Sequence, residues 1–190
     1  MTDRDILFDL LDCLAGIMHR TLEGLTQDAL RWQPDKEANS IAVTVWHVSR
    51  AWDVFKVRLF ANQPVTEELW QKNGWAAKTG YDPTGIGWGG FGNVAGYSLQ
   101  EVAAIPALSA AELLAYFDQV YEALRGYLDG LPVEALHGQA AGWSRDEQTV
   151  YEWLINLIID GSGHLGEIKA IKHMWERKAR LIRQEAEGAA

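Results

Sequence analysis

The sequence has little of the features that define secreted or membrane proteins. It contains one cysteine, Cys13, among 190 residues, so an internal disulfide is excluded and a reducing compartment is favoured. Cys13 lies among leucines at helical spacing, and we interpret it as a packing residue rather than a nucleophile. No apolar run reaches the roughly 18 residues that a membrane span needs, and the N-terminus, MTDRD, is unlike a signal peptide. We therefore expect a soluble, cytoplasmic protein.

Basic residues are also scarce. Lys and Arg number 17 against 26 Asp and Glu, and the net charge is −9. Binding to a nucleic-acid backbone or to an anionic membrane requires clustered basic side chains. We expect no nucleic acid and no membrane among the partners, and a small-molecule substrate in their place.

No stretch alternates apolar and polar residues as a half-buried strand does. Four stretches instead carry apolar residues at helical spacing: residues 4–26, 41–61, 109–131 and 149–175. The last two begin with the capping-box patterns Ser109-x-x-Glu112 and Thr149-x-x-Glu152. We predict an all-α protein, a four-helix bundle, whose charged tail after Trp175 extends the last helix before fraying.

A long connection, residues 62–108, joins the second predicted helix to the third, and glycine and tryptophan crowd it. Its Gly87-x-Gly89-x-x-Gly92 matches the dinucleotide fingerprint as a string. No apolar strand precedes it and no strand–helix–strand unit surrounds it, so we interpret the match as chance. Such a loop is either a functional lid or an ordered surface loop anchored by its tryptophans. We expect residues 1–190 to form one domain.

Polar side chains interrupt the apolar stripe of the last predicted helix. His164 lies inside the stripe, and Asp160 lies one turn before it on the flank. A carboxylate and an imidazole that face a core need partners. A divalent metal suits both, and a hydrogen bond between the two is the alternative. Gly161 and Gly163 each cost a helix about 1 kcal/mol and suggest that another helix or a ligand approaches closely there. His47, on the second predicted helix, is another inward-leaning histidine.

The order of these motifs resembles the DinB-like (damage-inducible, YfiT-type) superfamily, in particular its DinB_2 members. The resembling stretches are LTQDALRWQPDKEANSIAVTVWHVSRAWD and IIDGSGHLGEI, together with the connection rich in glycine and tryptophan. The resemblance implies a four-helix bundle with a metal site of three residues, one His on the second helix and an H-x-x-x-H pair on the fourth. By position these are His47, Asp160 and His164, with Asp160 where the family often has His. Glu167, one turn further, is an outer partner of the site, a base or a solvated side chain, and we favour the last.

The resemblance further implies a divalent ion such as Zn, Ni, Fe or Mn. Several relatives are transferases or isomerases that use a low-molecular-weight thiol, namely mycothiol, bacillithiol or glutathione. Two His and one carboxylate leave open positions for water and substrate, and such an ion can make a nucleophile of bound water or thiol near neutral pH.

Two hypotheses follow. The first is a metal-dependent hydrolase or thiol-dependent transferase whose pocket the Trp-rich loop closes. The second is a non-catalytic, stress-related binding protein on the same bundle, in which Asp160 marks a lapsed metal site. Aromatic-rich helical surfaces often pair, so a homodimer is a further hypothesis.

Overall fold

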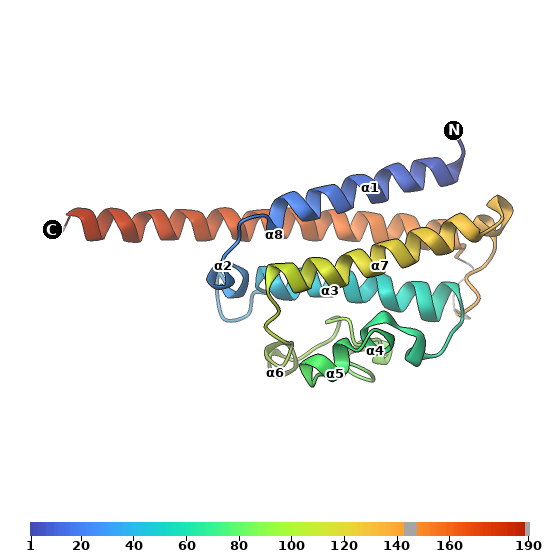
Figure 1. The fold of residues 1–190 in the computed structure, drawn as a ribbon, viewed down its shortest axis with the longest axis horizontal. Helices are drawn as coiled ribbons and strands as arrows, with labels where there is room; N and C mark the ends of the chain where they lie inside the picture. The colour runs from blue at the N-terminus through green and yellow to red at the C-terminus, as the bar shows by residue number, and fades with distance from the viewer. Residues whose placement is uncertain (143–147, 189–190) are drawn as a thin grey trace.

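The computed structural model describes residues 1–142 and 148–188. In this part of the chain four long helices lie alongside one another (Figure 1): α1 (Asp3–Leu22), α3 (Ile41–Val54), α7 (Ala110–Gly130) and α8 (Val150–Gly188). Helices α1 and α3 each pack against both α7 and α8, which closes the ring of a bundle. The described residues contain no strand, only an isolated bridge between Gln139 and Thr149. The predicted all-α, four-helix class is confirmed.

Shorter helices fill the connections. They are α2 (Gln27–Arg31), the π-helix η1 (Phe55–Phe60), η2 (Val65–Glu67), α4 (Leu69–Lys72), α5 (Trp75–Thr79), η3 (Trp88–Gly90), α6 (Leu99–Ala103) and η4 (Val133–His137). The connection between α3 and α7 therefore carries no long helix, as predicted. Figure 1 shows α4, α5 and α6 beside α3 and α7, on the side of the bundle away from α1. The π-helix continues α3 without a break, so the second predicted helix has the expected end but a wider last part.

Side-chain caps start the long helices where the sequence predicts them. The Glu112 carboxylate accepts a hydrogen bond from the Ser109 backbone N–H at 2.9 Å, and Ser109 in turn caps the Glu112 N–H. Thr149 and Glu152 make the same reciprocal pair at the start of α8. Behind these caps the apolar stripes of the four helices meet in one core, which includes Leu7, Leu11, Met18, Val48, Trp52, Phe117, Leu124, Leu154 and Ile168. Each such buried side chain contributes about 1.5–3 kcal/mol.

Cys13 lies on the outside of this bundle. Its neighbours Leu11 and Leu14 are buried in the core, whereas Cys13 is exposed. It falls between the core-facing positions of α1, because these recur every three or four residues. The interpretation of Cys13 as a packing residue is therefore wrong.

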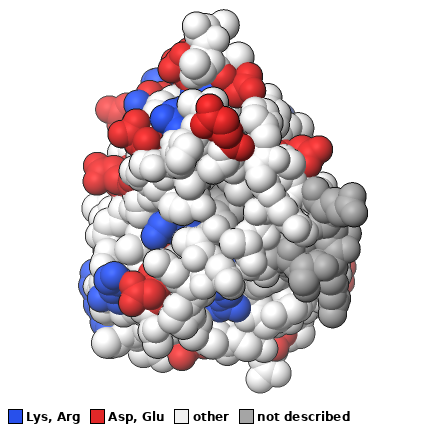
Figure 2. All heavy atoms as spheres, turned by 90° about the vertical axis from the view of Figure 1, so that its right-hand side faces the viewer, with Lys and Arg blue, Asp and Glu red and all other residues white. Residues whose placement is uncertain are grey.

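Helix α8 continues past Trp175 to Gly188 and extends beyond the other helices (Figure 1), so the charged tail does prolong it. None of the helices in the described residues is long and apolar enough to cross a membrane. On the face shown in Figure 2, the Lys and Arg side chains lie apart, with acidic and uncharged ones between them. The described residues of that face therefore form no continuous basic surface.

The two glycines beside Asp160 differ in their surroundings. A Cβ at Gly161 would lie 3.3 Å from Leu14 Cδ1 of α1 and 3.6 Å from Trp52 Cζ2 of α3. A Cβ at Gly163 would meet nothing within 4 Å, and the residue is exposed. Close approach of other helices thus explains Gly161, as the sequence suggests, but it does not explain Gly163.

This difference predicts that two alanine variants change the stability of the fold to different extents. Gly163→Ala should raise the free energy of unfolding by about 1 kcal/mol, because alanine forms helix better and has room here. Gly161→Ala should gain less or lose stability, because its Cβ crowds Leu14. Urea unfolding of both variants measures the difference, and a larger gain for Gly161→Ala would contradict it.

A buried ionic network joins α3 to the long connection. The Arg50 side chain is fully buried, and it donates to Glu68 Oε2 at 2.9 Å and to Asp53 Oδ2 at 3.2 Å. Arg58 of η1 pairs with the other oxygen of Glu68. Burial opposes the charge of Arg50, but Tyr116, Glu68 and Asp53 outweigh it and raise the pKa of the guanidinium. Two guanidinium groups thus share two carboxylates, which keeps the buried charge balanced.

The same groups fix the path of the glycine-rich loop (residues 80–97). Arg50 donates to the carbonyl oxygens of Phe91 and Gly92, and Arg58 donates to that of Gly90 at 3.0 Å. Gly92 itself has φ of +65°, and a Cβ there would lie 2.2 Å from the Pro83 oxygen. Only glycine tolerates both the conformation and the contact. No strand precedes this loop in the described chain, so the dinucleotide-like string is indeed chance.

Removing one partner from the network should destabilise the fold strongly. Glu68→Gln leaves Arg50 and Arg58 without their shared carboxylate, and we expect a loss of about 3–5 kcal/mol in the free energy of unfolding. The neighbouring Glu67 pairs with Lys72 at the surface, so Glu67→Gln should have a much smaller effect on the free energy of unfolding, because exposed ion pairs contribute little. Chemical denaturation compares the two, and similar small effects would contradict the role given to Glu68.

Candidate metal centre

The structure brings together the three side chains that the sequence singles out. His47 comes from α3, and Asp160 and His164 come from the facing helix α8. One ligand atom from each lies within 4.8 Å of the others. The two imidazole rings meet edge to face, with centroids 4.6 Å apart and an interplanar angle of 82°. Helix periodicity points both histidines inward, and the packing of α3 against α8 makes them neighbours.

Each imidazole is held from behind through Nδ1. His47 Nδ1 donates to the backbone carbonyl oxygen of Asn93 in the glycine-rich loop. His164 Nδ1 donates to Glu167 Oε2 at 3.0 Å, one turn along the same helix. A carbonyl and a carboxylate only accept, so both rings carry their proton on Nδ1 and present Nε2 as a lone-pair donor. The expectation that Glu167 is merely solvated is wrong, because it orients His164.

The two imidazoles have pKa values shifted in opposite directions. Burial is the main cause that lowers the pKa of His47, against the raising effect of the Asn93 carbonyl. The hydrogen bond from Glu167 is the main cause that raises the pKa of His164, against burial. His47 is therefore neutral near pH 7, whereas His164 keeps a proton to higher pH than an ordinary histidine. A metal ion must displace that proton, so metal affinity should fall as pH drops through the raised pKa of His164.

The Asp160 side chain is more exposed than the sequence predicts. It is 55% exposed, whereas that of His164 is 24% exposed. The expectation that both groups face the core, where burial would force them to find a partner, therefore holds for His164 alone. The distance from His164 Nε2 to Asp160 Oδ1 is 3.6 Å, which is too long for a hydrogen bond. The alternative of a buried hydrogen bond between the two is therefore wrong.

The donor set suits a divalent ion. Nitrogen and oxygen donors lie about 2.0–2.2 Å from a bound zinc, so ligation would draw the three donors slightly closer than they lie here. Asp160 can rotate because it is largely exposed. Two imidazoles and one carboxylate are ligands that Zn, Ni, Fe and Mn all accept.

A pocket of about 330 Å³ opens beside this cluster. Its described lining consists of His47, Ala51, Phe55, Asn93, Ala95, Trp153, Asn156, Leu157 and Asp160. The glycine-rich loop thus contributes directly to the pocket wall through residues 93 and 95. Its two neighbouring tryptophans, Trp70 and Trp75, are buried and stacked at 6.1 Å. The Trp70 indole N–H donates to the Tyr81 carbonyl oxygen at 2.9 Å, which anchors the start of the loop, whereas Trp88 within the loop is exposed. The interpretation as an ordered loop anchored by tryptophan is therefore supported at Trp70, and a function as a lid stays a prediction.

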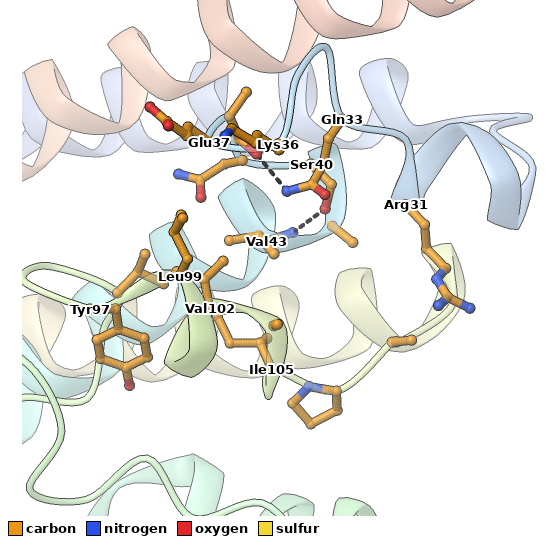
Figure 3. A pocket seen from close by; sticks show the side chains of 17 residues that line it. Arg31, Gln33, Lys36, Glu37, Ser40, Val43, Tyr97, Leu99, Val102 and Ile105 are labelled. Atoms are coloured by element: carbon orange, nitrogen blue, oxygen red, sulfur yellow. Dashed lines mark hydrogen bonds between the residues drawn. The ribbon is translucent and has the colours of Figure 1, made fainter.

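A second pocket, of about 450 Å³, is lined in part by Val94 and Tyr97 of the same loop (Figure 3). It is bordered by the start of α3 at Ser40, by Arg31 and by apolar side chains of α6 such as Val102. Figure 3 shows Ser40 engaged with the Val43 N–H, which caps α3. The three metal-suited side chains do not line this pocket. We assign it no role.

Two further residues, Glu167 and Asn93, support the centre through hydrogen bonds to the imidazoles. Glu167 follows His164 at a spacing of three, which is a helical pairing distance, so this signal was present. Asn93 lies in a loop where nothing fixes its distance from His47 in advance. The buried Arg50–Asp53 pair also has helical spacing within an apolar stretch, and that combination signals an ionic network.

Facing helices that contribute two imidazoles and a carboxylate define a helical-bundle protein with a candidate metal centre. A family model described as the DinB superfamily matches residues 14–168. The chain therefore belongs to the DinB superfamily. A comparison with curated protein sequences finds no match.

A solved structure supports the fold. The crystal structure of a conserved protein from Enterococcus faecalis is similar to this chain with a TM-score of 0.74 and 19% sequence identity, covering 90% of this chain and 96% of that one. At this identity the likeness concerns the fold alone.

The position of Glu167 behind His164 predicts its effect on metal affinity. Glu167→Ala should weaken the binding of Zn²⁺ by about 10–100-fold, because outer partners orient a metal-binding histidine and raise its basicity. Glu176→Ala, an exposed glutamate further along α8, is the matched control and should leave the affinity unchanged. Competition against a zinc-sensitive dye measures both, and equal affinities would refute a role for Glu167.

Proposed function

We propose that this protein binds a divalent metal ion through His47, Asp160 and His164 and acts with it on a small molecule, as a hydrolase or as a thiol-dependent transferase. The observation that carries the proposal is the arrangement of the two imidazoles. The Nδ1–H group of each ring donates a hydrogen bond to a fixed oxygen acceptor. This leaves Nε2 of each ring as a ligand atom beside the Asp160 carboxylate. Outer hydrogen bonds of this kind accompany almost all metal-binding histidines.

The bound ion would lower the pKa of a water or thiol ligand and so supply a nucleophile near neutral pH. The residues of the chain orient the ligand side chains and shape the pocket. The Asn93 carbonyl and Glu167 keep the imidazole protons on Nδ1. Phe55, Trp153 and Leu157 give the adjoining pocket apolar walls, which limit the access of water. Among the described lining residues Asp160 is the one carboxylate, and as a metal ligand it is unsuited to serve as a general base.

A low-molecular-weight thiol as co-substrate, a cytoplasmic location and a homodimer are all part of the proposal, and each comes from the sequence or the resemblance. The alternative is a non-catalytic, stress-related binding protein with a lapsed site. One observation favours that alternative: Asp160 is largely exposed, as ordinary solvated carboxylates are.

Metal content separates the two candidates. Protein purified without an affinity tag or a chelator should contain about one divalent metal per chain by elemental analysis. The double variant His47→Ala, His164→Ala should contain none, because a single carboxylate remains.

The control is a second double variant, His19→Ala, His137→Ala. Both of these histidines also lie beside a carboxylate, Asp118 at 2.7 Å and Asp3 at 3.1 Å, but outside the cluster. This variant should keep its metal. If the wild-type protein holds no metal even after incubation with Zn²⁺, Ni²⁺ or Mn²⁺, the enzyme proposal fails and the lapsed-site alternative replaces it.

A further inference from the structure

Asn93 occupies an unusual position beside the candidate metal centre. It is 7% exposed although it lies in a loop. Its backbone oxygen holds the His47 imidazole, and the residue also belongs to the lining of the pocket that includes Asp160. One residue therefore contacts a candidate metal ligand with its main chain and also lines the adjoining cavity.

The side-chain oxygen of Asn93 is buried and has no hydrogen-bond partner within residues 1–142 and 148–188. Buried polar atoms in native proteins are nearly always paired, so an unpaired one requires an explanation. A partner from outside the chain is the explanation that the pocket offers, because Asn93 forms part of its wall. No backbone N–H group of the described residues donates to this oxygen.

The loop is held firmly at this residue. The three preceding carbonyl groups, from Gly90 to Gly92, all accept hydrogen bonds from Arg50 or Arg58. The next residue, Val94, has φ of +79°, which is a strained conformation for a β-branched side chain. Such strain persists only where the surroundings over-determine it, and it clusters at ligand sites. The position of Asn93 is therefore built by the network rather than left to a mobile loop.

The rest of the pocket limits the ligand. Its described lining includes no Lys or Arg, and Phe55, Trp153 and Leu157 make it mainly apolar. A divalent ion at the centre would be balanced by the carboxylates of Asp160 and Glu167, which lie 3.6 Å and 3.0 Å from His164. No positive charge remains to compensate an anionic ligand.

We propose that Asn93 is a ligand-recognition residue, whose side-chain oxygen accepts a hydrogen bond from an N–H or O–H group of a neutral, partly apolar small molecule in the metal pocket. The inference rests on the proposed function, because the ligand lies beside the ion held by His47, Asp160 and His164. The apolar part of the ligand packs against Phe55 and Trp153, and its donor group points to Asn93.

The test compares two neutral probes on the protein loaded with Co²⁺. Benzamide carries an aromatic ring and N–H donors, whereas N,N-dimethylbenzamide has the same ring and carbonyl group without a donor. Changes in the visible absorption of the bound Co²⁺ report the dissociation constants. The wild-type protein should bind benzamide about tenfold more tightly than the dimethyl compound, as one hydrogen bond allows.

Two variants assign the preference to Asn93. Asn93→Leu removes the acceptor but keeps the backbone oxygen that holds His47, so it should bind both probes equally while still taking up Co²⁺. Asn93→Asp keeps an acceptor oxygen and should retain the preference for benzamide.

The outcomes separate this inference from the proposed function. If the wild-type protein takes up Co²⁺ but shows no preference for benzamide, the role of Asn93 is refuted whether or not the variants fold. A preference that survives in a folded Asn93→Leu variant refutes it as well. If the wild-type protein takes up no Co²⁺, the proposed function fails, and the inference falls with it.

Discussion

The buried guanidinium of Arg50 is the interaction on which the rest of the structure depends. A charge in a protein core is costly unless carboxylates and hydrogen-bond acceptors surround it. Arg50 obtains Asp53 from its own helix, Glu68 from the connection and two backbone oxygens from the glycine-rich loop. Asp53 in turn accepts the backbone N–H groups of Leu69 and Trp70, which fixes the start of α4. One charge thus determines the path of a long segment that has little regular structure.

The same network links the fold to the candidate centre. Arg50 lies one turn after His47 on α3, so the loop that satisfies the guanidinium must also pass the imidazole. Successive carbonyl groups of the loop consequently accept hydrogen bonds, first from the two arginines and then, at Asn93, from His47. The π-helix at the end of α3 takes part, because it carries both Arg58 and the pocket residue Phe55. Wider helical turns of this kind are frequent at functional sites.

The sequence predicts the parts of this arrangement that depend on local rules. Apolar periodicity and capping boxes give the four long helices, and the spacing of Asp160 and His164 gives one side of the cluster. The resemblance supplied the pairing of these two with His47, since periodicity alone does not tell which helices face each other. Asn93 could not be predicted, because its distance from His47 follows from the whole path of a glycine-rich loop. The predicted burial of Cys13 and Asp160 was wrong, because a shift of one position around a helix separates core from solvent.

Asp160 determines the number of carboxylates that would lie beside an ion at the centre. With histidine at this position, Glu167 would be the one carboxylate beside a divalent ion. With aspartate, two carboxylates would balance an ion bound here, and an oxygen-preferring metal would bind more favourably than at three imidazoles. The Asp160 side chain is also 55% exposed, so water can solvate it when no ion is bound. The fold therefore does not depend on a metal ion to neutralise a buried charge at Asp160. The buried charge of Arg50 is balanced by Asp53 and Glu68. The identity of an ion bound at this centre would be set by the chemistry of these ligands and not by the stability of the fold.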